Sequence, residues 1–193
     1  AGVLEAALRF VRDRLDGEPF IAVHWRRGDR LALSDRLTPE PHELFERVVE
    51  AASALRLGSV FFFTNCGARE TVLGLLRDLR GEGFAVATLG LEEPPRPDGW
   101  KEEPWNIALE MSIASFASHV IVSPSGLSVT VLEERWLLGW PPAHAFSNVR
   151  PWPDLFWHVD HILAASMAVV DGDPALAAAL RDHAGDGPAA LRC

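Results

Sequence analysis

The sequence FIAVHWRRGDR, residues 20–30, joins a short apolar run directly to a cluster of charged side chains. The run from Phe20 to Trp25 follows Pro19 and has the length and composition of a strand that is buried on both faces. Residues 26–36 are polar and typical of a loop. A buried strand that ends in a charged loop is the pattern from which the rest of the fold can be worked out.

The same combination of strand and helix recurs along the chain. The expected strands are residues 20–25, 60–64, 84–88 and 120–122, and the expected helices are residues 4–15, 39–57, 72–79, 105–117 and 127–138. Thr38 and Pro39 are expected to begin the second helix as its N-cap and first residue, and Gly58 to end it. Asp173 and Pro174 are expected to cap a final alanine-rich helix.

Consecutive strand–helix units predict an α/β fold, a Rossmann-like parallel sheet with helices on both faces. The expected domains are residues 1–170, one Rossmann-like domain, and residues 171–193, a C-terminal helix or tail. With the strand order 3-2-1-4, the first and fourth strands flank the switch point at which ligands bind in such sheets. The two segments richest in reactive side chains follow those two strands.

Composition excludes several classes of protein. The chain has 193 residues, of which 48% are hydrophobic and 23% are charged. This composition excludes wholesale disorder. Its net charge of −9 argues against contacts with nucleic acid or with an anionic membrane. Residues 111–132 lack Asp, Glu, Lys and Arg, but six serines and the Pro124–Gly126 break indicate buried core rather than a membrane span. Two cysteines leave the redox compartment open.

The first candidate site is the charged end of the first strand. Guanidinium groups match phosphate oxygens in pairs, so Arg26 and Arg27 point to a diphosphate as the natural ligand. Asp29 can orient one of these guanidinium groups, and His24 can donate to a polar ring. The alternative is that Asp29 only neutralises the arginines in a solvated loop.

The second candidate site is the small-residue turn from Ser123 to Ser128, between the fourth strand and the next helix. Backbone N–H groups at a helix N-terminus attract anions, and the hydroxyls of Ser125 and Ser128 add donors. A serine in such a turn is equally an ordinary N-cap. Together with the arginines, the turn predicts a diphosphate site that requires no metal and no organic cofactor.

Both segments resemble motifs of one enzyme family. His24-x-Arg26-Arg27-x-Asp29 resembles the HxRRxD motif of GDP-fucose-dependent fucosyltransferases, notably the protein O-fucosyltransferases and the α1,6-fucosyltransferases. The run ASHVIVS (117–123), the serines after it and EERWLLG (133–139) are similar to that family's last motif, and FFTN (62–65) lies where the family has a Thr-Asp step. The resemblance covers residues 20–139, and Gly126–Leu127 departs from the family's usual Thr-Phe.

The resemblance implies a role for each matched residue. Arg26 would bind the β-phosphate of GDP-fucose and stabilise the departing diphosphate, as the catalytic residue. His24 would contact the guanine, and Glu110 would accept a hydrogen bond from the guanine ring. Ser125 and Ser128 would contact the phosphates. The full set implied for donor binding is His24, Arg26, Arg27, Asp29, Glu110, Ser123, Ser125 and Ser128.

The resemblance also implies what the whole protein does. The chain would be the C-terminal, nucleotide-sugar half of a GT-B enzyme that transfers fucose to a protein or glycan hydroxyl, as in protein O-linked fucosylation. The N-terminal acceptor domain would be missing, so the chain would be a fragment or a stand-alone donor half, in the lumen of the endoplasmic reticulum or Golgi. Two alternatives stay open: a non-catalytic nucleotide-sugar or phosphate-binding domain, and an interaction module whose arginines form structural ion pairs.

Overall fold

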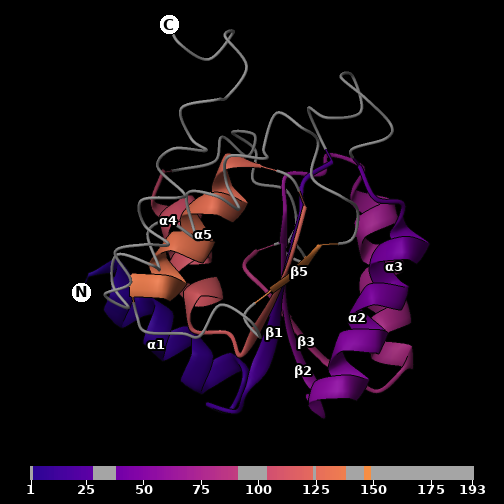
Figure 1. Cartoon of the computed structure of the whole chain (residues 1–193), viewed down its shortest axis with the longest axis horizontal. Coiled ribbons are helices and arrows are strands. Elements are labelled where there is room, and N and C mark those ends of the chain that lie inside the picture. Colours follow the sequence, from indigo (N-terminus) through magenta and orange to yellow (C-terminus); the bar gives the residue numbers. More distant parts are fainter. Residues whose placement is uncertain (1, 28–37, 91–103, 124, 138–145, 149–193) are drawn as a thin grey trace, which may run out of the picture. The chain divides into compact units, whose positions relative to one another are not determined.

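A computed structural model describes residues 2–27, 38–90, 104–123, 125–137 and 146–148 (Figure 1). Strands and helices alternate along the chain, as the sequence predicts. The helices are α1 (Val3–Arg14), α2 (Pro41–Leu55), α3 (Arg69–Gly81), α4 (Pro104–Ser115) and α5 (Gly126–Leu137). The strands are β1 (Phe20–Trp25), β2 (Ser59–Thr64), β3 (Ala85–Thr88), β4 (His119–Val122) and β5 (Phe146–Asn148).

All strand pairs are parallel, and the sheet order is β3-β2-β1-β4-β5. The predicted order of the first four strands is therefore confirmed, and β1 and β4 lie side by side where the order reverses. Strand β1 pairs with β2 from Phe20↔Ser59 to Trp25↔Thr64, and with β4 from Ile21↔His119 to Val23↔Ile121. The sequence did not predict β5, because three residues are too few to show a periodicity.

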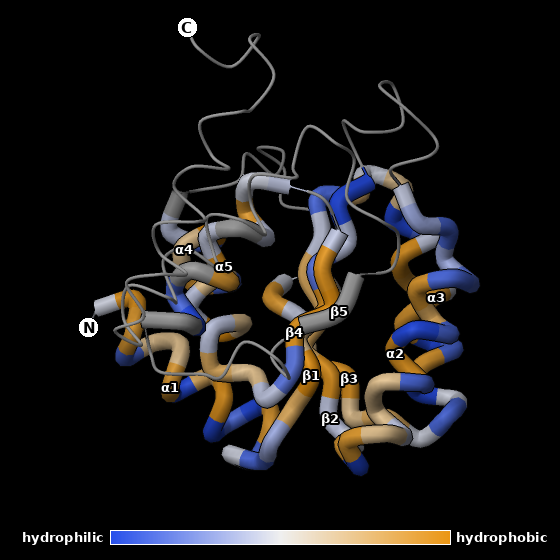
Figure 2. Tube along the Cα trace, in the orientation of Figure 1, coloured by the Kyte–Doolittle hydropathy of each residue, from blue (hydrophilic) through white to orange (hydrophobic). Residues whose placement is uncertain are grey.

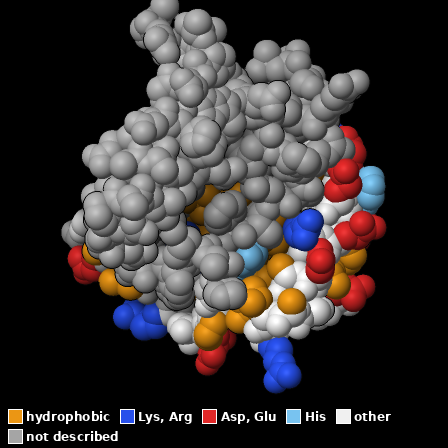
Figure 3. Space-filling model, viewed as in Figure 1, with side chains coloured by type: hydrophobic (Ala, Val, Ile, Leu, Met, Phe, Trp, Pro, Cys, Tyr) orange, Lys and Arg blue, Asp and Glu red, His pale blue; other side chains and the backbone are white. Residues whose placement is uncertain are grey.

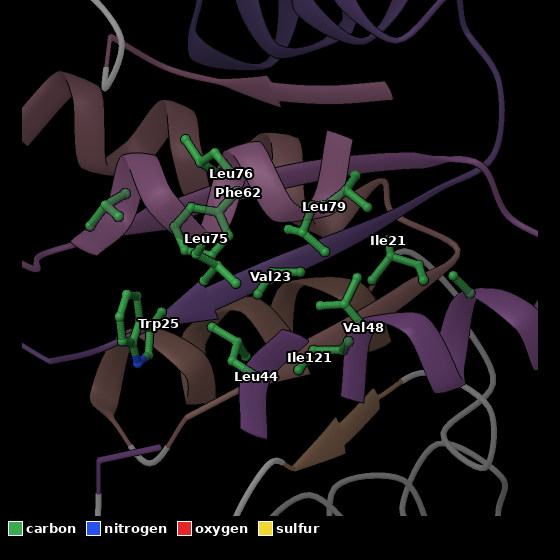
Figure 4. Close-up of a cluster of buried hydrophobic side chains, with 13 residues drawn as sticks. Ile21, Val23, Trp25, Leu44, Val48, Phe62, Leu75, Leu76, Leu79 and Ile121 are labelled. Carbon is green, nitrogen blue, oxygen red and sulfur yellow. The ribbon is translucent and has the colours of Figure 1, made fainter. Parts of the chain in front are cut away.

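The helices form one layer on each face of the sheet, which makes the fold a Rossmann-like α/β sandwich. Helices α2 and α3 cover one face, and α1, α4 and α5 cover the other (Figure 1). The tubes of β1, β2 and β4 are hydrophobic over most of their length (Figure 2). The face of β1 toward α2 and α3 packs into one apolar cluster (Figure 4), whose members include Ile21, Val23, Trp25, Leu44, Val48, Phe62, Leu75, Leu76, Leu79 and Ile121.

Both ends of α2 differ from the prediction. The helix begins at Pro41, and the N–H of Glu40 donates to Glu43 at 2.6 Å, so Glu40 rather than Thr38 precedes it. The carbonyl of Pro39 accepts a hydrogen bond from the indole of Trp25, which holds that residue in the preceding loop. At the other end Arg56 adopts left-handed backbone angles and terminates the helix two residues before Gly58.

The charge-free window of residues 111–132 divides into the end of α4, the whole of β4 and the first half of α5. Its side chains are largely buried, including Ile113, Ile121 and Val131. No helix in the described part of the chain is both long enough and apolar enough to cross a bilayer. The predicted final helix and the predicted boundary between residues 170 and 171 lie outside the described residues.

Candidate functional site

A cavity of about 130 Å³ lies at the carboxyl ends of β1 and β2, against α4 and the start of α5. This volume is close to the roughly 150 Å³ of an engineered cavity that binds benzene, so it has room for one ring-sized group. The described residues that line it are His24, Arg26, Phe63, Thr64, Asn65, Ile107, Glu110 and Leu127. The cavity therefore adjoins the switch point that the strand order predicts for a ligand.

The imidazole of His24 is held from one side by two serines that follow β4. Its Nδ1 lies 2.7 Å from the Ser128 hydroxyl and 3.4 Å from the Ser125 hydroxyl. Both hydroxyls are buried, and the Ser125 hydroxyl also accepts the backbone N–H of Ser128 at 3.1 Å, as an N-cap does. The ring of Phe63 stacks on the imidazole with 4.9 Å between centroids.

Burial, and secondarily the positive charge of Arg26, lowers the pKa of His24 from 6.5 to about 3. The imidazole is therefore neutral at physiological pH. A neutral imidazole has one nitrogen that donates and one that accepts a hydrogen bond. The ring can recognise a ligand by hydrogen bonding, but it adds no positive charge to a phosphate site.

The backbone where β1 ends is fixed from both neighbouring strands. On the β4 side, the Ser123 hydroxyl donates to the carbonyl of His24 at 2.9 Å and accepts the N–H of Arg26 at 2.8 Å. On the β2 side, Asn65 accepts the N–H of Arg27 at 3.0 Å, and the Thr64 hydroxyl donates to the carbonyl of Trp25. Side chains thus continue the hydrogen bonding of the sheet beyond its last pairs and hold the two arginines in place.

Arg26 and Arg27 point to opposite faces of the sheet, as alternation along a strand requires. Arg26 lines the cavity. Arg27 instead pairs with Glu40 at 3.2 Å and lies over the ring of Trp25, 5.2 Å from its centroid. The structure therefore places the Arg27 side chain against the segment before α2 and not in the cavity wall. Asp29, its expected partner, lies outside the described residues.

Glu110 projects from α4 to the cavity wall, opposite the strands. The helix that carries it is held at its C-terminal end by α5, because the buried guanidinium of Arg135 donates to the carbonyls of Ser115, Ala117 and Ser118. Burial lowers the pKa of Arg135 to about 10, which leaves it charged at neutral pH. The Arg135 of the EER segment therefore supports α4 and, through it, the position of Glu110.

The structure thus brings most of the predicted residues together, in two layers. His24, Arg26 and Glu110 line the cavity, and Ser123, Ser125 and Ser128 lie behind His24 and Arg26 with their hydroxyls bonded within the protein. Direct phosphate contacts of these hydroxyls stay a prediction, and their observed role is positional. Phe63, Ile107 and Leu127 were missed, although Phe63 could have been found from its register opposite His24.

One other hollow on the described surface is less suited to an anion. A second, larger hollow of about 690 Å³ lies against α2 and α3, where Arg77 is accompanied by Asp78 and Glu82. Acidic side chains gather over this side of the molecule (Figure 3). Within the described residues, no three His, Cys, Asp or Glu side chains are grouped as a metal site requires.

This arrangement of strands and helices is found in solved structures. The chain is similar in fold to part of POFUT1. A crystal structure of POFUT1 in complex with GDP matches it with a TM-score of 0.59 and 17% identity, over 76% of this chain and 47% of that chain. A second, in complex with GDP-fucose, matches with a TM-score of 0.57 and 17% identity, over 76% and 46%.

The matched part is less than half the length of those POFUT1 chains. No family model matches this sequence, and no curated protein sequence matches it. At 17% identity the likeness concerns the fold, a fucosyltransferase-like Rossmann arrangement, and the functional argument depends on the residues of the cavity.

Proposed function

We propose that this chain is the donor-binding half of a glycosyltransferase that binds GDP-fucose and takes part in fucosyl transfer to a protein or glycan hydroxyl. The observation that carries the proposal is the position of Arg26. Its backbone is bonded to Ser123 at the end of β4, and its side chain lines a cavity at the switch point of the sheet. The complexes of POFUT1 with GDP and GDP-fucose, which share this fold, support the same ligand class.

Arg26 supplies the positive charge that the reaction needs. Cleavage of the bond between the sugar and the diphosphate builds negative charge on the leaving oxygens, and a guanidinium held in place beforehand stabilises that charge. The proposal requires no metal ion for this step. The fixed backbone matters because a flexible arginine would have to be ordered at the moment of reaction.

His24 and Glu110 would bind the base of the nucleotide. A neutral imidazole nitrogen and a carboxylate both accept hydrogen bonds, and guanine presents N–H donors on one edge. The volume of the cavity suits a single ring system. Transfer by the whole protein, its acceptor and a location in the endoplasmic reticulum or Golgi lumen are part of this proposal.

Calorimetric titration with GDP tests the proposal. We expect saturable binding to the wild-type chain, weaker binding of ADP and UDP, and binding at least tenfold weaker in Arg26→Ala. The matched control is Arg27→Ala, which removes the adjacent charge on the other face and should leave GDP affinity within about twofold. Absence of saturable GDP binding would overturn the proposal in favour of an interaction module.

A second experiment separates transfer from binding alone. GDP-fucose is incubated with the chain and release of GDP is followed, first with water and then with candidate acceptor proteins or glycans. Release that depends on Arg26 supports the enzyme. Tight GDP binding with no release under any condition would favour the non-catalytic nucleotide-sugar-binding domain.

A further inference from the structure

The hydroxyl protons of the serines behind His24 can be assigned one by one. The Ser128 hydroxyl lies 2.7 Å from the carbonyl oxygen of Ser123, and a carbonyl can only accept. The single proton of Ser128 is therefore directed to that carbonyl. Any other use of it would leave two oxygens facing each other at hydrogen-bond distance with no proton between them.

Ser125 completes the assignment. Its oxygen accepts the backbone N–H of Ser128, and its proton is directed to the Ser128 oxygen at 3.2 Å. The Ser128 oxygen thus already donates its only proton and accepts one from Ser125. It retains one free lone pair, toward the Nδ1 of His24 at 2.7 Å.

The remaining contact determines the tautomer of His24. Since Ser128 has no proton left to give, Nδ1 must carry the hydrogen and donate it. The lowered pKa of His24, about 3, indicates one proton on the ring rather than two. Nε2 is then unprotonated, and none of the described residues forms a hydrogen bond with it.

We propose that Ser125 and Ser128 are positioning residues that hold His24 in its Nδ1–H tautomer, so that Nε2 presents a hydrogen-bond acceptor to the cavity. The Nδ1 edge is occupied by the serines and one face by Phe63, and the ring lines the cavity. The ligand class therefore has an N–H or O–H donor at Nε2, not a phosphate oxygen, which Nε2 would repel. The inference deepens the proposed function, and its ligand part depends on that function.

This tautomer divides the cavity wall by hydrogen-bonding type. Arg26 can only donate and attracts anionic oxygens, whereas Nε2 of His24 and the carboxylate of Glu110 accept. A ligand that fits both parts has an anionic group at one end and donors at the other. Inorganic pyrophosphate has only the first, and GDP has both.

The tautomer can be measured in the free protein. We expect ¹⁵N NMR of ring-labelled histidine at pH 7 to show a pyrrole-like Nδ1 and a pyridine-like Nε2 for His24, whose signals are identified by their absence in His24→Gln. A pyridine-like Nδ1 in the wild-type chain would overturn the inference, whatever the chain binds. This measurement needs neither ligand nor variant of the serines.

Variants test the role of the hydroxyls. Ser128→Ala removes the acceptor of Nδ1, so the ¹⁵N shifts should move toward the average of two tautomers, and Ser125→Ala should move them less because its contact is 3.4 Å. Thr130→Ala is the matched control, since that hydroxyl on the same helix bonds only to the carbonyl of Gly126 among the described residues. Unchanged His24 shifts in Ser128→Ala would contradict the positioning role.

Two probes separate this inference from the proposed function. In Ser128→Ala, GDP affinity should fall about tenfold, whereas pyrophosphate affinity should stay unchanged. Equal losses of GDP and pyrophosphate affinity would show that Ser128→Ala disturbs the whole site, and would overturn the proposal that Ser128 acts through His24. Failure of the wild-type chain to bind GDP would overturn the proposed function and the ligand part, while the NMR result would still decide the tautomer.

Discussion

The two faces of strand β1 have unlike surroundings, although their residues alternate along the same six-residue strand. On one face Ile21, Val23 and Trp25 pack against α2 and α3 in an apolar cluster. On the other face His24 and then Arg26 meet hydroxyls, a carboxylate and a cavity. Burial of the first face stabilises the strand. The second face can therefore hold polar groups in fixed positions, although burying those groups costs stability. The two faces should therefore respond differently to substitution.

The largest effect is expected on the apolar face. Trp25→Ala removes a fully buried indole that packs on Phe62 and donates to the carbonyl of Pro39, and should lower the free energy of unfolding by about 3–5 kcal/mol. Urea denaturation measures this. The control Trp105→Ala, at an exposed side chain, should change it by less than about 0.5 kcal/mol. If Trp25→Ala does not fold, Trp25→Phe should still be less stable than the control.

On the polar face, the next largest effect concerns function. Under the proposed function, Arg26→Ala should reduce fucosyl transfer at least about 100-fold, because a charge-assisted contact is lost where charge develops. Arg26→Lys keeps the charge but loses the paired geometry and should recover only a small part. Stability should remain near wild type, measured by thermal denaturation. A large loss of stability with little loss of transfer would assign Arg26 to the scaffold.

The pH dependence of stability should reveal His24. Its pKa is about 3 in the folded protein and 6.5 as its ordinary value, so the unfolded chain binds more protons below pH 6.5. The contribution of neutral His24 is therefore complete above pH 6.5 and is lost as the pH falls toward 3, by about 1.4 kcal/mol per pH unit. Urea denaturation at pH 7 and pH 5 should show this loss in the wild type.

His24→Gln is the comparison for this measurement. The variant should lose about 2 kcal/mol less than the wild type between pH 7 and pH 5, since it lacks the titrating imidazole while other groups titrate alike. If the free energy of unfolding of the two proteins changed equally with pH, His24 would not be held neutral in the folded protein.

The smallest effect is expected for Arg27. Its ion pair with Glu40, whose side chain is 44% exposed, and its contact with Trp25 are together worth at most about 1 kcal/mol in the free energy of unfolding. A double-mutant cycle of Arg27→Ala with Glu40→Gln measures the pair. If Arg27→Ala weakened GDP binding as much as Arg26→Ala does, the two faces of β1 would not differ in function.

Much of the fold could be predicted from local sequence pattern. Apolar runs and helical stripes predicted all described helices and the first four strands, because those signals arise between residues a few positions apart. The predicted ends of α2 were less accurate. Pro39 and Pro41 are equally suited to begin a helix, and the structure adds contacts that the local pattern does not show: Trp25 donates to the carbonyl of Pro39, and the N–H of Glu40 donates to Glu43.

Part of the candidate site could also be predicted. The residues His24, Arg26 and Glu110, and the serines after β4, were singled out from the charged strand end and a family resemblance. The sequence did not predict which of these side chains line the cavity and which bond within the protein. Hydroxyls that were expected to face phosphates are bonded to His24, and Arg27 is bonded to Glu40.

The sequence by itself thus determined the described helices and the first four strands, that these strands are parallel, and which residues follow β1 and β4. Only the tertiary structure decided which nitrogen of His24 bears the proton, since that depends on the distance to Ser128, 104 positions along the chain. The physical reason is one of range. Backbone conformation responds to near neighbours, whereas hydrogen bonding and ion pairing respond to distances of tenths of an ångström between segments that meet only after folding.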